Sequence, residues 1–256
     1  MENKIIIGNM KMNMDKNDIS NYLKQIKNKI KNENIVFCPV SLYIPYFLKE
    51  GYNVGLQNIY FEDKGAFTGE ISSMQAKSMG ISNVIIGHSE RRSIFSESDD
   101  FINKKIKASL THHVRPIFCI GETEEENSKQ MTEEVLKTQI KEGLKNIISD
   151  DLQKIIIAYE PVWAIGTGNT MSDDEIKIAI SFIKEEVKKL FEIEDIKVIY
   201  GGSVNEKNID VLCTIDNVDG FLIGGACTDP EKFLKILEVA VPMWLFLILF
   251  DKFRQK

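Results

Sequence analysis

The sequence predicts one α/β domain built as a (β/α)8 barrel, a closed ring of eight parallel strands that alternate with helices. Short apolar runs alternate with helix-patterned segments eight times along the chain, which indicates a parallel sheet. A chain of 256 residues, 43% hydrophobic, suits a single barrel. No GxGxxG or Walker sequence follows the first run, although a doubly wound nucleotide-binding sheet usually carries such a phosphate loop there.

The expected strands are short and apolar, with many β-branched residues, as is typical of strands buried on both faces of a sheet. They span residues 4–7, 34–38, 53–57, 83–86, 115–119, 154–159, 196–200 and 219–223.

Helices are expected between these strands. Asp15 or Asn17 is a suitable N-cap for the first, which carries apolar residues on one face. A longer helix is expected over residues 128–148, with the acidic run 124–126 near its start, where the helix dipole favours negative charge. We interpret these acids as a solvated cap and not as a metal site.

The charge distribution and the cysteines argue against nucleic-acid binding and against a cysteine metal site. The net charge of −6 comes from intermixed Lys and Glu, so there is no basic face for nucleic acid. Cys38, Cys119, Cys213 and Cys227 form no CxxC or Cys/His pattern of a metal site, and the first apolar run is too short for a signal peptide. Both observations favour a reducing, cytoplasmic setting.

The sixth expected strand ends in a carboxylate, Glu160, and a loop follows. The carboxyl ends of barrel strands carry the chemistry, so Glu160 is a candidate base, although an ion-paired structural glutamate is the alternative. Trp163, Ala164 and Ile165 are expected to form an apolar tip of a movable lid. The next helix begins at the capping box formed by Ser172 and its third following residue, a glutamate.

Polar residues also follow the first and fourth strands. Asn9 and Lys11 come after the first strand, and His88, Ser89 and Glu90 come after the fourth. Because parallel strands end at one face of the barrel, these side chains are expected to converge there with the sixth-strand carboxylate. The alternatives are a hydrogen-bonded histidine in a strand-to-helix turn and a solvated surface lysine.

Glycine pairs follow the seventh and eighth strands. Gly201, Gly202 and Ser203 follow the seventh strand, and Gly224 and Gly225 follow the eighth. Barrels often bind phosphate at this position through backbone N–H groups, so we expect a phosphate subsite, with tight turns as the alternative.

A long excursion follows the third strand. Residues 57–70 read QNIYFEDKGAFTGE, and Phe67, Thr68 and Gly69 lie too far from the strand to form a simple turn. We expect this segment to protrude and to contact a partner.

Six stretches together resemble the triosephosphate isomerase family, which adopts the TIM barrel. They are AYEPVWAIGTG, GHSERR, GAFTGE, CIGE, YGGSV and IGGA, in the family's order and approximate spacing, and the similarity covers residues 4–239. The resemblance implies interconversion of dihydroxyacetone phosphate and D-glyceraldehyde 3-phosphate through an enediolate, in glycolysis and gluconeogenesis, without cofactor or metal. The alternatives are another phosphate-binding barrel isomerase or lyase, and a catalytically silent barrel retained as a binding protein.

The resemblance also implies roles for individual residues. Glu160 corresponds to the base, and His88 corresponds to the electrophile, acting as a neutral imidazole. The implied catalytic set is His88, Glu160, Lys11, Asn9 and Glu90. The implied substrate-binding set is Asn9, Lys11, Ser89, Gly166, Ser203, Gly224 and Gly225. The family also implies a cytoplasmic homodimer in which the loop around Thr68 docks beside the partner's Asn9 and Lys11.

The chain departs from the family pattern at several positions. Met10 stands where tryptophan is usual, which predicts slightly reduced stability. Residues 169–171 replace the usual Lys-Thr-Ala of the lid hinge, and Cys227 replaces a serine. We divide the chain into a barrel over residues 1–240 and an atypical apolar tail over residues 241–256. The apolar run that leads into that tail, residues 239–250, is shorter than the roughly twenty residues of a membrane-spanning helix.

Overall fold

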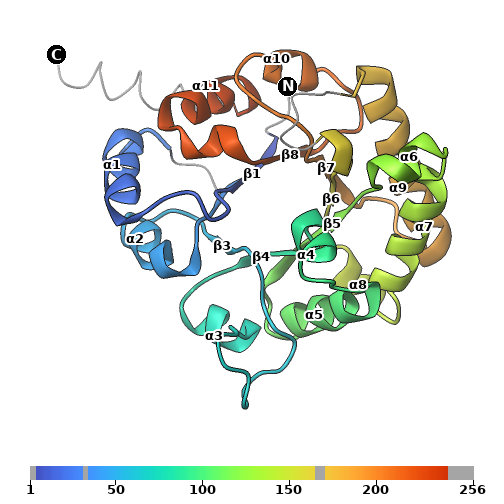
Figure 1. The fold of residues 1–256 in the computed structure, drawn as a ribbon, viewed down its shortest axis with the longest axis horizontal. Helices are drawn as coiled ribbons and strands as arrows, with labels where there is room; N and C mark the ends of the chain where they lie inside the picture. The colour runs from blue at the N-terminus through green and yellow to red at the C-terminus, as the bar shows by residue number, and fades with distance from the viewer. Residues whose placement is uncertain (1–3, 31–33, 165–170, 242–256) are drawn as a thin grey trace.

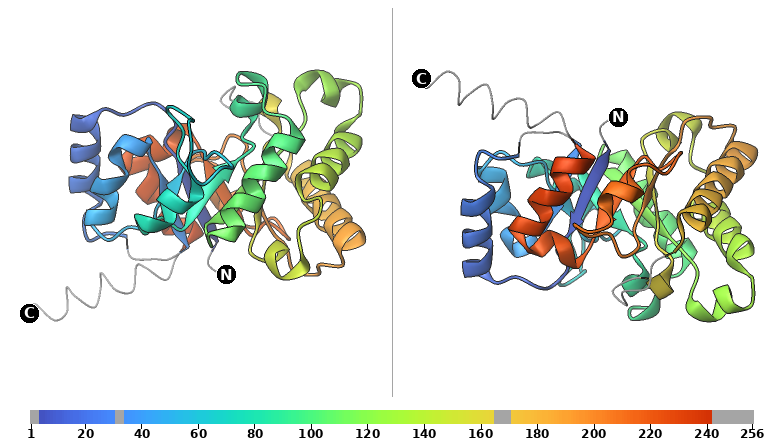
Figure 2. Two further views of the ribbon diagram at one scale, coloured as in Figure 1. Left: turned by 90° about the horizontal axis from the view of Figure 1, so that it is seen from below. Right: turned by 90° about the horizontal axis from the view of Figure 1, so that it is seen from above.

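A computed structural model describes residues 4–30, 34–164 and 171–241 of the chain. Its strands form a ring of parallel strands enclosed by helices, as Figure 1 shows along the barrel and Figure 2 shows from two sides. The predicted (β/α)8 fold is therefore confirmed. The predicted tail falls on residues of which 242–256 lie outside the described part, so the domain division stays a prediction.

The eight strands lie in the order β2-β1-β8-β7-β6-β5-β4-β3. They are β1 Ile5–Asn9, β2 Ile35–Cys38, β3 Gly55–Leu56, β4 Asn83–Ile86, β5 Arg115–Ile120, β6 Ile156–Tyr159, β7 Lys197–Tyr200 and β8 Gly220–Ile223. All seven pairs of neighbouring strands in this order are parallel. The two end strands, β2 and β3, form no such ladder along their described residues, and a single parallel bridge joins Phe37 to Val54 where they meet. We call the β2–β3 junction the seam.

The helices cover the outside of the barrel. They are α1 Lys16–Ile26, α2 Ile44–Lys49, α3 Ser73–Ser78, α4 Ser89–Ser93, α5 Asp99–Thr111, α6 Glu124–Ser128, α7 Thr132–Gly143, α8 Ser149–Leu152, α9 Asp173–Phe191, α10 Ile209–Leu212 and α11 Pro230–Ala240, with the 3-10 turns η1 Ser41–Tyr43, η2 Val162–Ala164 and η3 Gly225–Thr228. Asp15, and not Asn17, caps α1, because its carboxylate accepts two backbone N–H groups of the first turn.

Two hydrophobic clusters hold these layers together. Side chains that alternate along the strands form one cluster, which includes Ile7, Ile117 and Ile199. The larger cluster joins the other strand face to the helices and includes Phe37 and Phe118. This alternation is expected of barrel strands, whose residues point in turn to the interior and to the surrounding helices.

Two local predictions are wrong. The helix expected over 128–148 is shorter, because α7 spans only Thr132–Gly143: Gln130 has a left-handed backbone (φ 60°) that separates α7 from α6, and Asn146 has one (φ 59°) beyond its end. The apolar tip expected of Trp163 and Ala164 is also not found: Ala164 is fully buried, and the Trp163 indole donates a hydrogen bond to Glu122. Ile165, the third member of that tip, lies outside the described residues.

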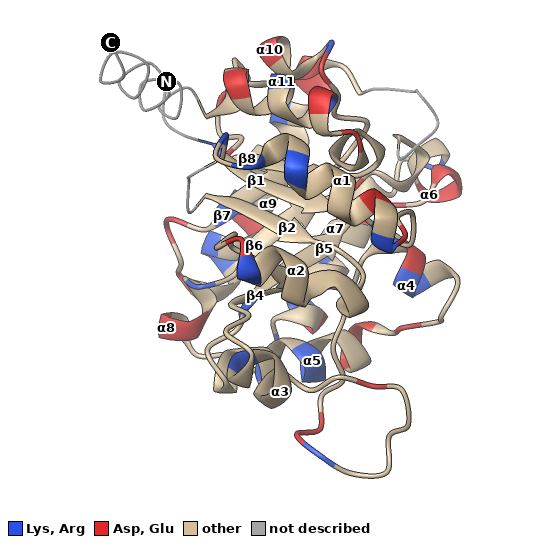
Figure 3. Cartoon of the chain, turned by 90° about the vertical axis from the view of Figure 1, so that its left-hand side faces the viewer, with Lys and Arg blue, Asp and Glu red and all other residues tan. Residues whose placement is uncertain are grey.

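The segment between β3 and α3 protrudes from the body, as predicted, and Figure 3 shows it projecting well beyond the helices. Residues 62–70 are all exposed along it. On the face seen in Figure 3, acidic and basic residues are intermixed over the helices. No helix within the described ranges is long and apolar enough to cross a membrane.

Candidate active site

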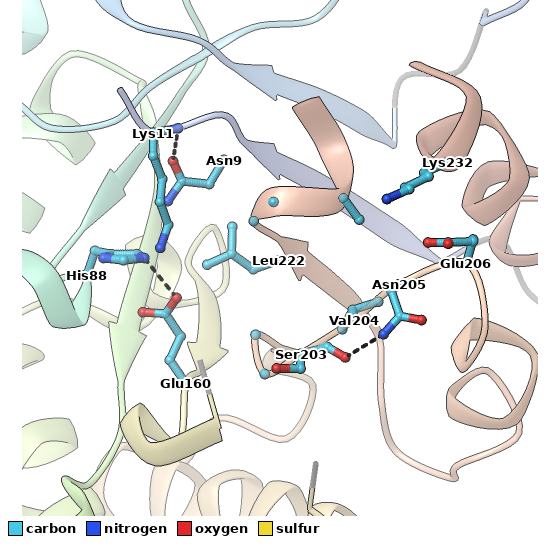
Figure 4. A pocket seen from close by; sticks show the side chains of 15 residues that line it. Asn9, Lys11, His88, Glu160, Ser203, Val204, Asn205, Glu206, Leu222 and Lys232 are labelled. Atoms are coloured by element: carbon cyan, nitrogen blue, oxygen red, sulfur yellow. Dashed lines mark hydrogen bonds and ion pairs between the residues drawn. The ribbon is translucent and has the colours of Figure 1, made fainter. Parts of the chain in front are cut away.

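A cavity of about 330 Å³ lies at the carboxyl ends of the strands, where the sequence predicted the chemistry. Its lining comes from loops that follow β1, β4, β6, β7 and β8, and Figure 4 shows the side chains around it. The lining residues are Asn9, Lys11, His88, Glu160, Gly201, Gly202, Ser203, Val204, Asn205, Glu206, Leu222, Gly224, Gly225, Ala226 and Lys232.

An acid and an imidazole face each other at one end of this cavity. The Nε2 atom of His88 lies 3.2 Å from Oε1 of Glu160, and the two side chains are 6% and 3% exposed. Glu160 directly follows β6 and His88 directly precedes α4, so two strand ends bring them together. The Nε2 atom of His88 is therefore close enough to the Glu160 carboxylate for a proton to pass between them, and both groups are shielded from water.

The backbone fixes the orientation of His88. The ring is the N-cap of α4, and its Nδ1 accepts the backbone N–H of Glu90 at 3.2 Å. The proton of a neutral ring is therefore on Nε2, facing Glu160. Burial lowers the pKa of His88 more than any other single influence, but the carboxylates of Glu160 and Glu90 together outweigh burial and raise it.

Glu160 is one of the most buried carboxylates in the molecule, with 2% of its surface exposed. Burial alone raises its pKa, but the combined effect of His88, the Cys119 thiol and Lys11 lowers it below its usual value. The backbone N–H of Ser89 lies 3.5 Å from Oε2. Glu160 is therefore kept ionised in the empty site, which is the form that a general base requires.

Lys11 brings a positive charge to the same end. Its Nζ forms an ion pair with Oε1 of Glu90 at 2.7 Å, and the two side chains are partly exposed. Its backbone is left-handed (φ 51°), a conformation supported by the Asn9 carboxamide, which accepts the Lys11 N–H at 3.1 Å. A carboxamide of Gln57 also donates to the Lys11 carbonyl at 2.9 Å. Such a costly backbone conformation, held by several contacts, is typical of functional positions.

Glycines line the opposite end of the cavity. A Cβ atom at Gly225 would meet nothing within 4 Å, and one at Gly224 would meet only the Lys11 Cε at 3.8 Å. A side chain would fit at either position, so packing does not require glycine there. Because glycine has no side chain, the backbone at both positions is open to a ligand. Ser203 also lines this end, and its hydroxyl donates to the Ala164 carbonyl.

Gly201 differs from these two glycines. Its N–H donates to the Tyr159 carbonyl at 2.7 Å, so it is not the phosphate donor that the sequence suggested. A Cβ atom at Gly201 would lie 2.8 Å from Cγ of Glu160. Gly201 therefore makes room for the acid.

Most of the predicted site residues are brought together. Asn9, Lys11, His88, Glu160, Ser203, Gly224 and Gly225 line the cavity. Ser89 is buried beside it, Glu90 lines a neighbouring cavity, and Gly166 lies outside the described residues. The sequence reasoning missed Asn205, Glu206 and Lys232 on the rim, because these residues lie five, six and nine positions beyond the end of the preceding strand.

Comparisons with known proteins show the family to which the chain belongs. A family model described as triosephosphate isomerase matches residues 4–240. The triosephosphate isomerase of Clostridium botulinum (strain ATCC 19397 / Type A) is 41% identical over 246 residues, covering 93% of this chain and 99% of that protein. The same enzyme from Dictyoglomus turgidum is 40% identical over 247 residues, with the same two coverages. That from Natranaerobius thermophilus is 38% identical over 248 residues, covering 94% and 97%. The chain therefore belongs to the triosephosphate isomerase family.

Proposed function

We propose that this cavity interconverts dihydroxyacetone phosphate and D-glyceraldehyde 3-phosphate, with Glu160 as the base. Family membership supports an isomerase that interconverts an aldose and a ketose phosphate, a step of glycolysis and gluconeogenesis. The observation that carries the residue assignment is the contact between His88 and Glu160 at one end of a cavity whose other end is lined by glycines.

The reaction moves a proton between two adjacent carbons, so one base can remove it from the first carbon and return it to the second. Glu160 is ionised and buried, and it faces the cavity. The C–H bond breaks as the carboxylate takes the proton, its electron pair forms the C=C bond, and the carbonyl π pair moves onto oxygen to give an enediolate. The hydroxyl proton then passes from one enediolate oxygen to the other by way of His88, and return of the first proton from Glu160 to the neighbouring carbon completes the exchange.

The enediolate needs donors for its oxygen charge. His88 acts as the neutral tautomer, with its Nε2–H directed into the site, because Nδ1 accepts a backbone N–H. The Glu160 carboxylate raises the pKa of His88 in the empty site, but this effect is lost when Glu160 takes the substrate proton and becomes neutral. In the empty site this donor faces Glu160, so the substrate enters between the two side chains and separates them. Lys11 adds positive charge, and Asn9 supports the Lys11 backbone.

The phosphate occupies the glycine-lined end. Gly224, the N-cap of η3, and Gly225, its first residue, expose their backbone, and Ser203 lines the same cavity. Gly166 belongs to the same set by the family resemblance alone. Binding the phosphate remote from the reacting carbons contributes to holding them against the base.

The test is the isomerase rate with glyceraldehyde 3-phosphate, measured for the parent and for Glu160→Gln, with Glu231→Gln as an exposed control. Removing a general base is expected to lower kcat by about 10²- to 10⁴-fold, while the control keeps the parent rate. A parent chain that is folded but inactive would reject this function and leave the binding-protein alternative.

We also propose a homodimer formed through the loop around Thr68. A second cavity of about 550 Å³ adjoins the site and is lined by Asn9, Lys11 and Glu90 together with apolar side chains. Met12, Ile94 and Phe95 are exposed there, Met12 by 89%. Exposed apolar side chains around a hollow are typical of a protein interface, and the protruding loop of a second copy has the shape to fill it.

Dimerisation is tested with Thr68→Arg, which places a long cation at the tip of the loop. Sedimentation is expected to show dissociation, and kcat is expected to fall because Asn9 and Lys11 lose the partner's support. Thr214→Arg, at an exposed position on another side of the barrel, controls for the added charge. A monomeric Thr68→Arg protein with parent activity would contradict the proposal.

The same proposal places the reaction in the cytoplasm. All four cysteines are buried as free thiols, which supports a reducing compartment. Fractionation of cells that express the chain, followed by an activity assay of each fraction, tests this assignment.

A further inference from the structure

Lys232 is a cation on the rim of the cavity that none of the roles above uses. It lies in the first turn of α11, where its backbone N–H donates to the Asp229 cap. Its side chain lines the cavity with Glu206 and Asn205. Figure 4 shows Lys232 and Glu206 on the same side of the cavity, across from Lys11, His88 and Glu160.

The two lysines of the cavity differ in their partners. Lys11 is held by Glu90 at 2.7 Å, so part of its charge is compensated before any ligand arrives. For Lys232, no ion pair or side-chain hydrogen bond is found among the residues that the structure describes. No direct ion pair therefore compensates its ammonium charge before an anion arrives.

The position of Lys232 relative to the glycines determines which end of the cavity its charge makes attractive to an anion. Gly224 and Gly225 begin η3, which leads through Asp229 directly into α11, so the phosphate end of the cavity and Lys232 belong to one continuous segment. The acid and imidazole occupy the other end. A dianionic phosphate is therefore attracted to the end that places its carbon chain beside the base.

We propose that Lys232 guides the phosphate group of the substrate into the glycine-lined end and sets the affinity for it, while Glu206 opposes this attraction. The inference rests on the proposed function, since it assumes a phosphorylated substrate in this cavity. Lys232 contacts no reacting atom, so its contribution is to binding and orientation. It should act equally on the substrate and on inorganic phosphate.

The experiment compares Lys232→Met with Lys235→Met, an exposed lysine of the same helix that does not line the cavity. The KM for glyceraldehyde 3-phosphate and the inhibition constant of inorganic phosphate are measured at low and at physiological ionic strength. Lys232→Met is expected to raise both constants about three- to tenfold at low salt with kcat unchanged. The effect is expected to shrink near 0.15 M salt, where screening acts over about 8 Å, and Lys235→Met is expected to change neither constant.

Glu206→Gln supplies a test of opposite sign, with Glu231→Gln as its exposed control. Removing the carboxylate is expected to lower both constants about two- to threefold at low salt. Equal effects of Lys232→Met and Lys235→Met, or a fall in kcat without a change in phosphate inhibition, would overturn the proposal. Calorimetric titration with inorganic phosphate reads the same difference without turnover, so an inactive parent would reject the proposed reaction while still testing Lys232.

Discussion

Replacing Gly201 with alanine is expected to disable the base without unfolding the barrel. The added Cβ would lie 2.8 Å from Cγ of Glu160 and 3.4 Å from its Oε1. Ordinary carbon contacts are about 3.5–4.0 Å, so Cγ must move by roughly 0.7–1.2 Å. Glu160 is buried and is held by His88, so this displacement breaks the geometry that aims the carboxylate at the substrate.

The size of the effect follows from that displacement. A misplacement of about 1 Å costs roughly 10²-fold in rate, which corresponds to about 2.7 kcal/mol of transition-state stabilisation. Overpacking costs about 1–3 kcal/mol of stability, and the lost freedom of glycine in the unfolded chain returns about 0.4–1 kcal/mol. The net loss of unfolding free energy is expected to lie between about 0 and 2.6 kcal/mol, so Gly201→Ala should stay folded.

Steady-state kinetics and urea unfolding measure the two quantities in the same preparation. Gly225→Ala is the matched control, because a Cβ there meets nothing within 4 Å but faces the phosphate end. It is expected to raise KM and to leave kcat near the parent value, whereas Gly201→Ala lowers kcat. A folded Gly201→Ala protein with the parent kcat would refute the steric argument and the assignment of Glu160 to the chemistry.

Three further predictions concern buried groups. Burial raises the pKa of Glu122, despite hydrogen-bond donors that include the Trp163 indole. The protonated carboxyl therefore favours folding at low pH, and this contribution is lost as pH rises from about 4.5 through the raised pKa. Glu122→Gln is expected to gain stability relative to the parent over that pH range, and a constant difference in unfolding free energy at all pH values would contradict this. Lys105→Met removes a fully buried partner of Glu97, which keeps its ion pair with Arg91, so the loss is expected to be at most about 3 kcal/mol in urea unfolding, and Glu97→Gln in the same chain is expected to restore part of it. Met10→Ala, at a site that is 2% exposed, is expected to cost about 3 kcal/mol by the same measurement, and a loss below about 1 kcal/mol would show that Met10 is loosely packed.

The strands were predictable because burial on both faces leaves a strong signal in composition. Every expected run became a strand, and the ends at Asn83, Ile86 and Tyr159 agree with the prediction. The break between α6 and α7 was not predictable, because Gln130 adopts a left-handed backbone without the glycine that usually marks one.

The site was predictable where its residues directly follow strands. Glu160 and His88 meet because parallel strands end on one face, which the alternating pattern already implied. Lys232 and Glu206 were not found, because Lys232 approaches the cavity through the fold of η3 and α11, and Glu206 approaches it through the loop between β7 and α10. The hydrogen bond from the Gly201 N–H to the Tyr159 carbonyl was likewise not predictable, because it depends on how the ends of β6 and β7 pair in space.

The barrel is expected to open more easily at the seam between β2 and β3 than between its other strands. β3 has only two residues, and the junction is closed by the bridge between Phe37 and Val54 and the 3.0 Å hydrogen bond from the Phe37 N–H to the Asn53 carbonyl. Local opening is expected to begin here, so the amides of β3 should exchange with deuterium sooner than those of β5. Because β3 leads directly into the protruding loop, docking of that loop on a second copy would slow this exchange and make assembly part of what keeps the barrel closed.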